Sequence, residues 1–379
     1  MWSDLKHRIS SFINTKTENH VLSSYSIVDR SALGDWEITI PENNHTHTET
    51  IAFSNYTVKN LPRPYWHEYF QVANESFTPF FYYEVKDAEI VGQSGITTSP
   101  PNFIHLENSV FQTEFFKRTN DVRKIPIRKF LPGQKITGPA VVLSNYFHTN
   151  YFHWITETLP RVLNLKKAFS KPLTFILSEN PPSFQFETLK LLLGNDDKIL
   201  EQTSQVLQVE NLIIPSFLHK RSDKFSNINL YRSDVLAKLS DVILNEISLE
   251  ESESTTPEIL FISRKNAKKR PFKEEYIIEN QLKGQSYEII EASDYSFQEQ
   301  VRLYHQAKVI IAPHGAGLTN TLFCKQGTKI IELFPPDKYI RDATFYYQTS
   351  KAVGLEHYLV NLDKFELFDF KNISENRIK

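Results

Sequence analysis

A turn rich in small residues, His314-Gly315-Ala316-Gly317, stands directly after the apolar run at 309–312 and could bind an anion. Glycine lets the backbone come close to a ligand, and the N–H groups in the first turn of a following helix attract negative charge. We therefore expect the amides of Gly315, Ala316 and Gly317 to bind a diphosphate. The alternative interpretation is a tight turn that needs small residues for steric reasons alone.

Basic residues follow a second apolar run, 259–262, in the loop 263–271, which reads SRKNAKKRP. Ligands of open α/β sheets bind beyond the carboxyl ends of the strands, and both the basic loop and the glycine turn leave strands at that edge. Arginine pairs with phosphate oxygens through two parallel N–H donors. We expect Ser263, Arg264 and Arg270 to meet the same diphosphate, whereas the lysines of the loop are interpreted as solvated.

Glu332 is a carboxylate near the end of the otherwise apolar segment 329–334. A buried acid requires a hydrogen-bonding partner, because its desolvation is otherwise costly. A ribose with two hydroxyl donors is one such partner, and a protein N–H group or an arginine is the other. The sequence leaves both open.

A cluster of His, Asn, Trp and Glu residues follows a third apolar run, 140–144. His153 and Glu157 are four residues apart, so they share one face of a helix and could act as a base with its orienting acid, or share one proton. The alternative is a core histidine with a surface glutamate. The remaining polar and aromatic residues of the cluster are assigned to an acceptor side: His148, Asn150, Trp154 and Arg161.

Several motifs of other enzyme classes are missing from the sequence. No Asp-x-Asp occurs, which favours neutralisation of a diphosphate by arginine and helix amides rather than by a divalent cation. The spacing from His148 to His153 is not typical of a zinc site. Neither Gly-x-Gly-x-x-Gly nor a Walker A sequence is present, which disfavours NAD, FAD and P-loop chemistry. We expect no metal and no cofactor.

Alternating strand and helix patterns must position these residues. In the first half we expect strands at 140–144 and 173–177 and one or two further strands within 205–215. We expect a helix that ends near residue 169 and helices at 183–193 and 228–247. In the second half we expect strands at 259–262, 287–290, 309–312 and 329–334, with helices at 273–283, 296–307 and 318–324. Such alternation is typical of parallel sheets.

Three regions follow from these patterns. Residues 1–135 are β-rich and are part of, or added to, an acceptor domain. Residues 136–250 form an acceptor-side Rossmann-like domain. Residues 251–379 form a donor nucleotide-binding Rossmann-like domain, whose tail after residue 365 stays with it or returns to the first domain. The acidic, serine-rich stretch 248–257 is the expected boundary.

Composition excludes several classes of function. The chain of 379 residues is 40% hydrophobic and 23% charged with a net charge of −2, so it has no electrostatic field for nucleic acid. One cysteine excludes internal disulfides. Residues 1–14 lack a secretory signal and could form an amphipathic helix that packs on its own protein or lies on a membrane.

Three blocks of the sequence resemble glycosyltransferase family 61, which includes bacterial capsular-polysaccharide proteins. The blocks lie between residues 141 and 336 and read HTNYFHWITETLPRV, FISRKNAKKRPF and IIAPHGAGLTNTLFCKQGTKIIELFPP. The resemblance implies a GT-B fold with two Rossmann-like domains facing a cleft. It also implies inverting, metal-independent transfer of a hexose or pentose from a nucleotide sugar, commonly a UDP-sugar, to a saccharide. His314 then lies beside the leaving diphosphate, and Glu157 or His153 is the base.

The same resemblance leads to an expected setting. Because the sequence shows no anchor and no disulfides, we interpret it as a bacterial cytoplasmic enzyme that makes surface polysaccharide at the inner face of the membrane, with at most peripheral membrane contact. The alternative is a non-catalytic nucleotide- or glycan-binding protein of a polysaccharide assembly.

Overall fold

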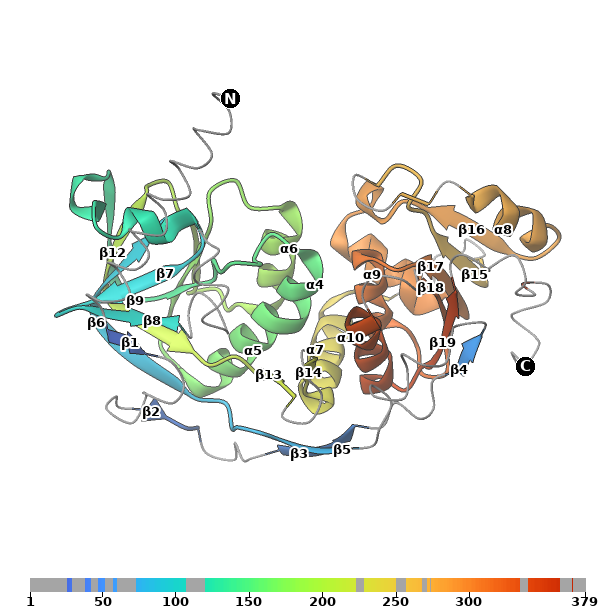
Figure 1. Cartoon of the computed structure of the whole chain (residues 1–379), viewed down its shortest axis with the longest axis horizontal. Helices are drawn as coiled ribbons and strands as arrows, with labels where there is room; N and C mark the ends of the chain where they lie inside the picture. The colour runs from blue at the N-terminus through green and yellow to red at the C-terminus, as the bar shows by residue number, and fades with distance from the viewer. Residues whose placement is uncertain are drawn as a thin grey trace, which may run out of the picture. The chain divides into compact units, whose positions relative to one another are not determined.

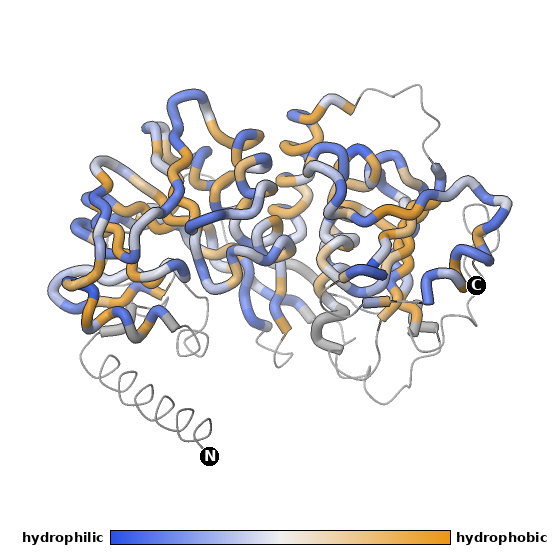
Figure 2. Tube along the Cα trace, turned by 90° about the horizontal axis from the view of Figure 1, so that it is seen from above, coloured by the Kyte–Doolittle hydropathy of each residue, from blue (hydrophilic) through white to orange (hydrophobic). Residues whose placement is uncertain are grey.

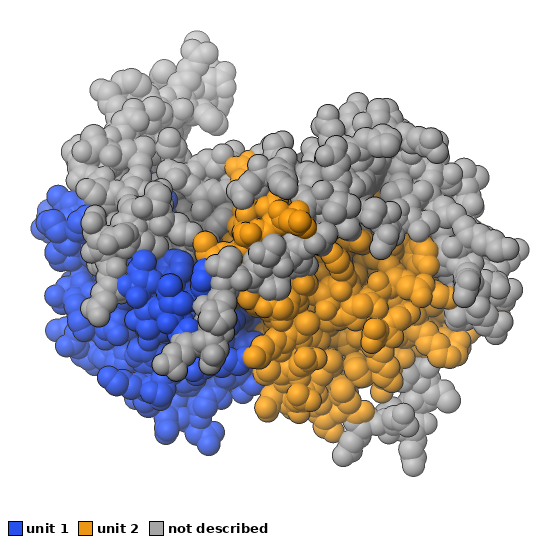
Figure 3. Space-filling model, turned by 90° about the horizontal axis from the view of Figure 1, so that it is seen from below, with its two compact units in different colours: residues 1–45, 79–217 blue, residues 46–78, 218–379 orange. Residues whose placement is uncertain are grey.

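The computed structural model describes residues 26–28, 38–41, 47–51, 57–59, 73–106, 120–222, 228–249, 257–267, 271–272, 274–334, 340–361 and 370. The chain divides into two compact units, Met1–His45 with Pro79–Phe217 and Thr46–Thr78 with Leu218–Lys379 (Figures 1 and 3). Within the described ranges, no helix is long and apolar enough to cross a membrane. The expected N-terminal amphipathic helix lies outside these ranges.

The first unit is built on a mixed sheet with the spatial order β1-β8-β7-β6-β12-β9-β10-β11, and β2 pairs with β6. Its strands are β1 (Ser26–Val28), β2 (Ile38–Thr39), β6 (Tyr82–Val91), β7 (Ile96–Ser99), β8 (Phe103–His105), β9 (Gly133–Val142), β10 (Thr174–Leu177), β11 (Lys198–Glu201) and β12 (Val206–Pro215). Its helical segments are η3 (Asn120–Lys124), η4 (Arg128–Phe130), α4 (Tyr151–His153), η5 (Trp154–Thr158), α5 (Leu159–Ala168) and α6 (Ser183–Leu192).

Strands β9 to β12 of this sheet are doubly wound. They run parallel in the order β12-β9-β10-β11, so the chain steps outward from β9 on one side and returns to β12 on the other. Strand β6 then pairs antiparallel with β12. Strands β1, β2, β6, β7 and β8 of the β-rich N-terminal region therefore extend the first unit's own sheet, whereas residues 46–78 of that region belong to the second unit. The core of the first unit combines both parts of its sheet, with Tyr83 and Ile90 packed among residues of β9 and β12.

The second unit contains a parallel sheet of six strands in the order β16-β15-β17-β18-β19-β4. Their bounds are β4 (Thr57–Lys59), β15 (Ile259–Ile262), β16 (Tyr287–Ile290), β17 (Val309–Pro313), β18 (Lys329–Phe334) and β19 (Glu356–Asn361). Two strand pairs lie outside it: β3 (His47–Ile51) with β5 (Ala73–Phe77), and β13 (His219–Arg221) with β14 (Asn229–Tyr231). The helical segments are α7 (Ser233–Glu246), α8 (Glu275–Leu282), η6 (Ala292–Asp294), α9 (Phe297–Gln306), η7 (Ala316–Phe323) and α10 (Ile340–Ala352).

Each face of this sheet is covered by a different set of helices. Alternate strand residues such as Phe261, Ile311 and Leu333 form one core cluster with Ile278 and Leu282 of α8. The residues between them, including Glu332, point to the other face, because strand side chains alternate. There α10 packs on β19, η7 and α7. The hydrophobic colour follows the inner strands and the hydrophilic colour the outer segments (Figure 2).

The division into units differs from the boundary expected at residue 250. Helix α7 belongs to the second unit, because Ser240 donates a hydrogen bond to the carbonyl of Leu322 at 2.7 Å. Tyr231 likewise donates its backbone N–H to Gln348 of α10 at 2.9 Å. The expected helix at 228–247 is also shorter than expected, since its first residues form β14. The acidic stretch after α7 therefore connects two parts of one unit.

Candidate functional site

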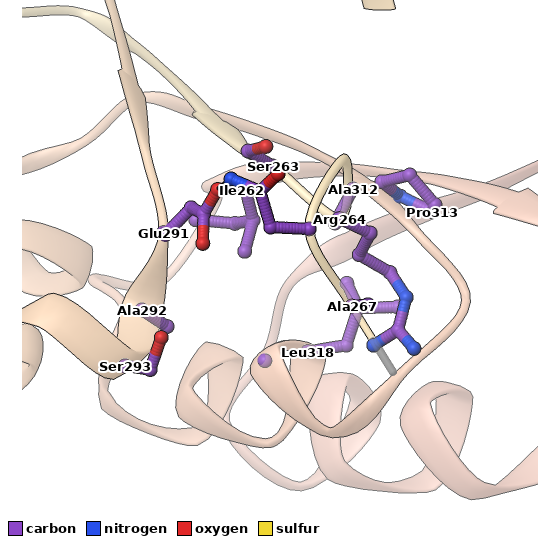
Figure 4. Close-up of a pocket in the computed structure, with 12 residues that line it drawn as sticks. Ile262, Ser263, Arg264, Ala267, Glu291, Ala292, Ser293, Ala312, Pro313 and Leu318 are labelled. Carbon is purple, nitrogen blue, oxygen red and sulfur yellow. Dashed lines mark hydrogen bonds between the residues drawn. The ribbon is translucent and has the colours of Figure 1, made fainter. Parts of the chain in front are cut away.

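Strands β15 and β17 lie side by side at the point where the second sheet changes direction. From β15 the chain passes to β16 on one side, and from β17 it passes to β18 on the other. Ligands of doubly wound sheets bind beyond the carboxyl ends of the strands at this switch point. A cavity of about 330 Å³ lies there. It is lined by residues at the carboxyl ends of β15, β16 and β17 and in the turns that follow them (Figure 4).

Two charged side chains line this cavity. Its twelve lining residues include one cation, Arg264, and one carboxylate, Glu291. Figure 4 shows them on opposite sides of the cavity. The expected residues Ser263, Arg264 and Gly317 belong to the lining. Arg270 lies outside the described residues, so its expected role stays a prediction.

Glu275 of α8 fixes the loop that carries Arg264. One of its oxygens accepts the backbone N–H of Arg264 at 2.7 Å, and the other accepts the hydroxyl of Ser263 at 2.8 Å. The carbonyl of Arg264 accepts the N–H of Phe272 at 3.2 Å. Glu275 is buried. The hydroxyl that we expected to meet a diphosphate is thus engaged in holding the loop, and Glu275 is a positioning residue that the sequence did not reveal.

The glycine turn is required by close contacts rather than by backbone strain. A Cβ atom on Gly315 would stand 2.0 Å from Nη1 of Arg264, although the φ of 170° is extended and open to any residue. A Cβ atom on Gly317 would stand 3.0 Å from Ile262. Residues 316–323 form the 3₁₀ helix η7, which begins two residues before the expected helix. The guanidinium of Arg264 therefore lies against the backbone at the start of η7.

His314 does not line the cavity but begins a buried hydrogen-bond chain. Its Nδ1 lies 2.5 Å from one oxygen of Glu332, and Nε2 of His357 lies 2.9 Å from the other. Nδ1 of His357 lies 2.8 Å from the hydroxyl of Ser350 in α10. His314, Glu332 and His357 share one face of the sheet, because Ala312 pairs with Glu332, Ile330 pairs with His357, and His314 lies two residues after Ala312, just beyond β17.

Glu332 is therefore satisfied by protein groups and not by a ribose. It is fully buried, and each oxygen has a histidine partner. Burial acts to raise its pKa, but the hydrogen bonds and charges of His314 and His357 outweigh burial and lower the pKa below its ordinary value. The sequence left open whether Glu332 meets a ribose or a protein group, and the structure shows protein groups, His314 and His357.

Replacement of Glu332 by glutamine is expected to lower the free energy of unfolding by about 1–3 kcal/mol near neutral pH, because one buried histidine N–H loses its acceptor. The pKa of Glu332 is lower in the folded protein than in the unfolded chain. The ionised carboxylate therefore adds to the free energy of unfolding at pH values above the pKa of the unfolded chain, and this contribution is lost as the pH falls through the pKa of the folded protein. Urea denaturation of both proteins from neutral to acidic pH should show the difference shrinking. A difference that stays constant with pH contradicts this account, and the exposed Glu356→Gln is the matched control.

In the first unit, His153 and Glu157 make the expected contact. Nδ1 of His153 lies 2.7 Å from an oxygen of Glu157. The side chain of Glu157 is 6% exposed and that of His153 is 16% exposed. The ring of Phe147 stacks on the imidazole of His153, with the two ring centroids 4.4 Å apart. The pair follows β9, which adjoins β12 at the switch point of this sheet.

The helix that carries this pair widens between α4 and α5. Residues Trp154–Thr158 form the π-helical turn η5, in which the N–H of Leu159 donates to the carbonyl of Trp154. Pro160 has no N–H to continue the α-helical pattern, and its ring crowds the carbonyl four residues earlier. Proline at the start of α5 thus explains the wider turn, and such turns frequently occur at functional sites.

The structure gives structural roles to three residues assigned to the acceptor side. Asn150 caps α4 by accepting the N–H of Phe152 at 3.0 Å. Trp154 is fully buried and donates to Thr188 at 2.9 Å. Arg161 is also buried, donates to the carbonyl of Pro215 and lies over the ring of Phe217. Trp154 and Arg161 are therefore buried supports of the fold, whereas Asn150 is exposed and its expected contact with an acceptor stays a prediction.

His148 is held by the loop after β9. Its Nδ1 contacts the carbonyl of Asn145, and its own carbonyl accepts an amide N–H of Gln185 at 2.7 Å. Burial lowers its pKa, and the contact with the Asn145 carbonyl partly opposes this. In the part of the chain that the structure describes, no group of three or more His, Cys, Asp or Glu side chains is arranged to hold a metal.

These features define a mixed α/β protein in which two doubly wound sheets each place polar groups at the switch point. Residues 151–331 match the family model described as Glycosyltransferase 61, so this stretch is a glycosyltransferase family 61 domain. It includes the His153–Glu157 pair, Arg264 and the glycine turn.

A shorter match extends to eukaryotic relatives. The chain is 39% identical over 54 residues to Protein O-linked-mannose beta-1,4-N-acetylglucosaminyltransferase 2 from Homo sapiens and from Pan troglodytes. The match covers 13% of this chain and 9% of each relative. The chain therefore spans less than a tenth of the length of these relatives.

Proposed function

We propose that this chain is an inverting glycosyltransferase that moves a sugar from a UDP-sugar to a saccharide acceptor. The observation that carries the proposal is the cavity at the β15/β17 switch point, where Arg264 lies against the start of η7. Arginine and first-turn amides together suit a diphosphate. The family 61 domain supports the reaction class, and the name of the eukaryotic relatives, an N-acetylglucosaminyltransferase, supports transfer of a hexose derivative.

In the proposed reaction, His153 acts as the base and Glu157 orients it. A carboxylate that accepts from Nδ1–H leaves Nε2 of His153 as the proton acceptor. The acceptor hydroxyl loses its proton to Nε2, and its oxygen forms a bond to the anomeric carbon. The bond from that carbon to the diphosphate oxygen breaks, and the diphosphate leaves with the electron pair. Arg264 and the amides at 315–317 stabilise the negative charge that develops there.

The remaining parts of the proposal concern the setting. We assign the donor to the second unit and the acceptor to the first, as in a GT-B enzyme. We also propose metal-independent turnover and a role in bacterial surface polysaccharide synthesis at the inner face of the cytoplasmic membrane. The absence of Asp-x-Asp from the sequence supports metal-independent turnover.

The experiment that tests the function measures release of free nucleotide from a panel of nucleotide sugars by the full chain, with mono- and oligosaccharide acceptors, with and without EDTA. The expected result is UDP release that requires an acceptor and survives chelation. Loss of turnover in EDTA, restored by magnesium, would contradict the metal-independent mechanism. Binding of nucleotide without turnover for any donor and acceptor would support a binding protein instead.

Replacement of Gly315 by alanine is expected to weaken UDP binding about tenfold, because the new Cβ atom would displace the Arg264 guanidinium. The unfolding free energy should change little, since the extended backbone at Gly315 accepts any residue. Isothermal titration with UDP and thermal denaturation measure the two effects. A variant that loses stability while keeping its affinity would show that the glycine serves the fold and not the site.

A further inference from the structure

The carboxylate on the far side of the cavity, Glu291, has no role in the mechanism above. It is the first residue after β16, and Nδ2 of Asn266 donates a hydrogen bond to its Oε1. Asn266 lies in the loop after β15 and also lines the cavity. The contact orients the carboxylate between two loops that both border the ligand space. A carboxylate held in this way accepts hydrogen bonds from hydroxyl groups.

The cavity is therefore polarised from one end to the other. Arg264 offers positive charge beside η7, and Glu291 offers only acceptors beside β16 (Figure 4). A ligand that is anionic along its whole length would be repelled at the β16 side. A ligand with a diphosphate at one end and neighbouring hydroxyls at the other matches both ends. The volume of about 330 Å³ falls in the range of small-molecule sites.

We propose that Glu291 binds the ribose hydroxyls of the nucleotide and makes the site specific for ribonucleotides. This inference rests on the proposed function, because it takes the diphosphate to lie at Arg264. In doubly wound sheets an acidic residue beyond a neighbouring strand commonly accepts from the ribose 2′-hydroxyl. Glu332, the other carboxylate that the sequence offers to a ribose, is excluded by its burial and its two histidine partners. Asn266 is the positioning residue for the carboxylate.

The test compares UDP with 2′-deoxy-UDP by isothermal titration of the full chain. The wild type is expected to bind UDP about tenfold or more tightly than 2′-deoxy-UDP, because the carboxylate loses one donor. Glu291→Ala is expected to bind the two with nearly equal affinity. The ratio is the informative quantity, since repulsion between Glu291 and the diphosphate is common to both ligands and cancels.

Asp294→Ala is the matched control. It removes the same charge from the same short turn, is exposed and does not line the cavity, so it should keep the wild-type ratio. A wild-type ratio near one, or an unchanged ratio in Glu291→Ala, overturns the ribose assignment while leaving UDP binding intact. Failure of the wild type to bind either nucleotide overturns the assignment together with the proposed function.

Discussion

Replacement of Arg264 by alanine is expected to lower the affinity for UDP by about 100- to 1,000-fold. The guanidinium lies against the backbone at Gly315, where the first-turn amides of η7 begin. Its loss removes the cationic side chain from the lining of the cavity and leaves the diphosphate to the amides alone. Arg264→Lys should recover only part of the affinity, because an ammonium group lacks the paired, planar donors of a guanidinium.

The measurement is a UDP titration together with the Michaelis constant for the donor. Lys265→Ala is the matched control, since Lys265 is the next residue, is exposed and does not line the cavity. An equal loss in both variants would indicate general electrostatic attraction by the basic loop. An unchanged affinity in Arg264→Ala would remove Arg264 from the site and with it the placement of the diphosphate.

The inner strands of the second sheet could be predicted from the sequence because they are buried on both faces. Such strands read as continuous apolar runs, and the runs at 259–262 and 329–334 match β15 and β18. The segment 287–290 matches β16, which is a partly buried strand at the edge of the sheet. The capping box of Ser296 and Glu299 likewise marks the start of α9 and is present. The sequence does not distinguish β14 from α7, because Leu230 and Tyr231 continue the apolar spacing of α7 and hide the turn between the strand and the helix.

The candidate site was only partly predictable. Arg264 and the glycine turn are visible because each follows an apolar run directly. Glu275 and His357 are not visible, because their contacts depend on how α8 and β19 lie against the sheet. His357 reaches Glu332 only through the register of β19 with β18. Trp154 and Arg161 misled the prediction, since residue type alone does not distinguish a ligand contact from a buried support.

Replacement of His153 by alanine is expected to lower kcat by about 100- to 10,000-fold, the range for removal of a general base. The affinity for UDP should stay at the wild-type value, because in our proposal the donor is bound by the second unit. This separation distinguishes the variant from Arg264→Ala, in which donor affinity falls. If the proton acceptor is the imidazole itself, added imidazole should restore part of the activity in the space left beside Phe147.

Glu157→Gln tests the orienting role of the carboxylate. An amide can donate to Nδ1 and favour the tautomer with the proton on Nε2, so kcat should fall although the imidazole remains. Imidazole should not rescue this variant, and the exposed Glu179→Gln should behave as wild type. If Glu157→Gln is as inactive as His153→Ala and imidazole rescues neither, the base is Glu157 and His153 is its hydrogen-bond donor. Full kcat in both variants would leave the pair a structural contact that joins α4 to the wide turn before Pro160.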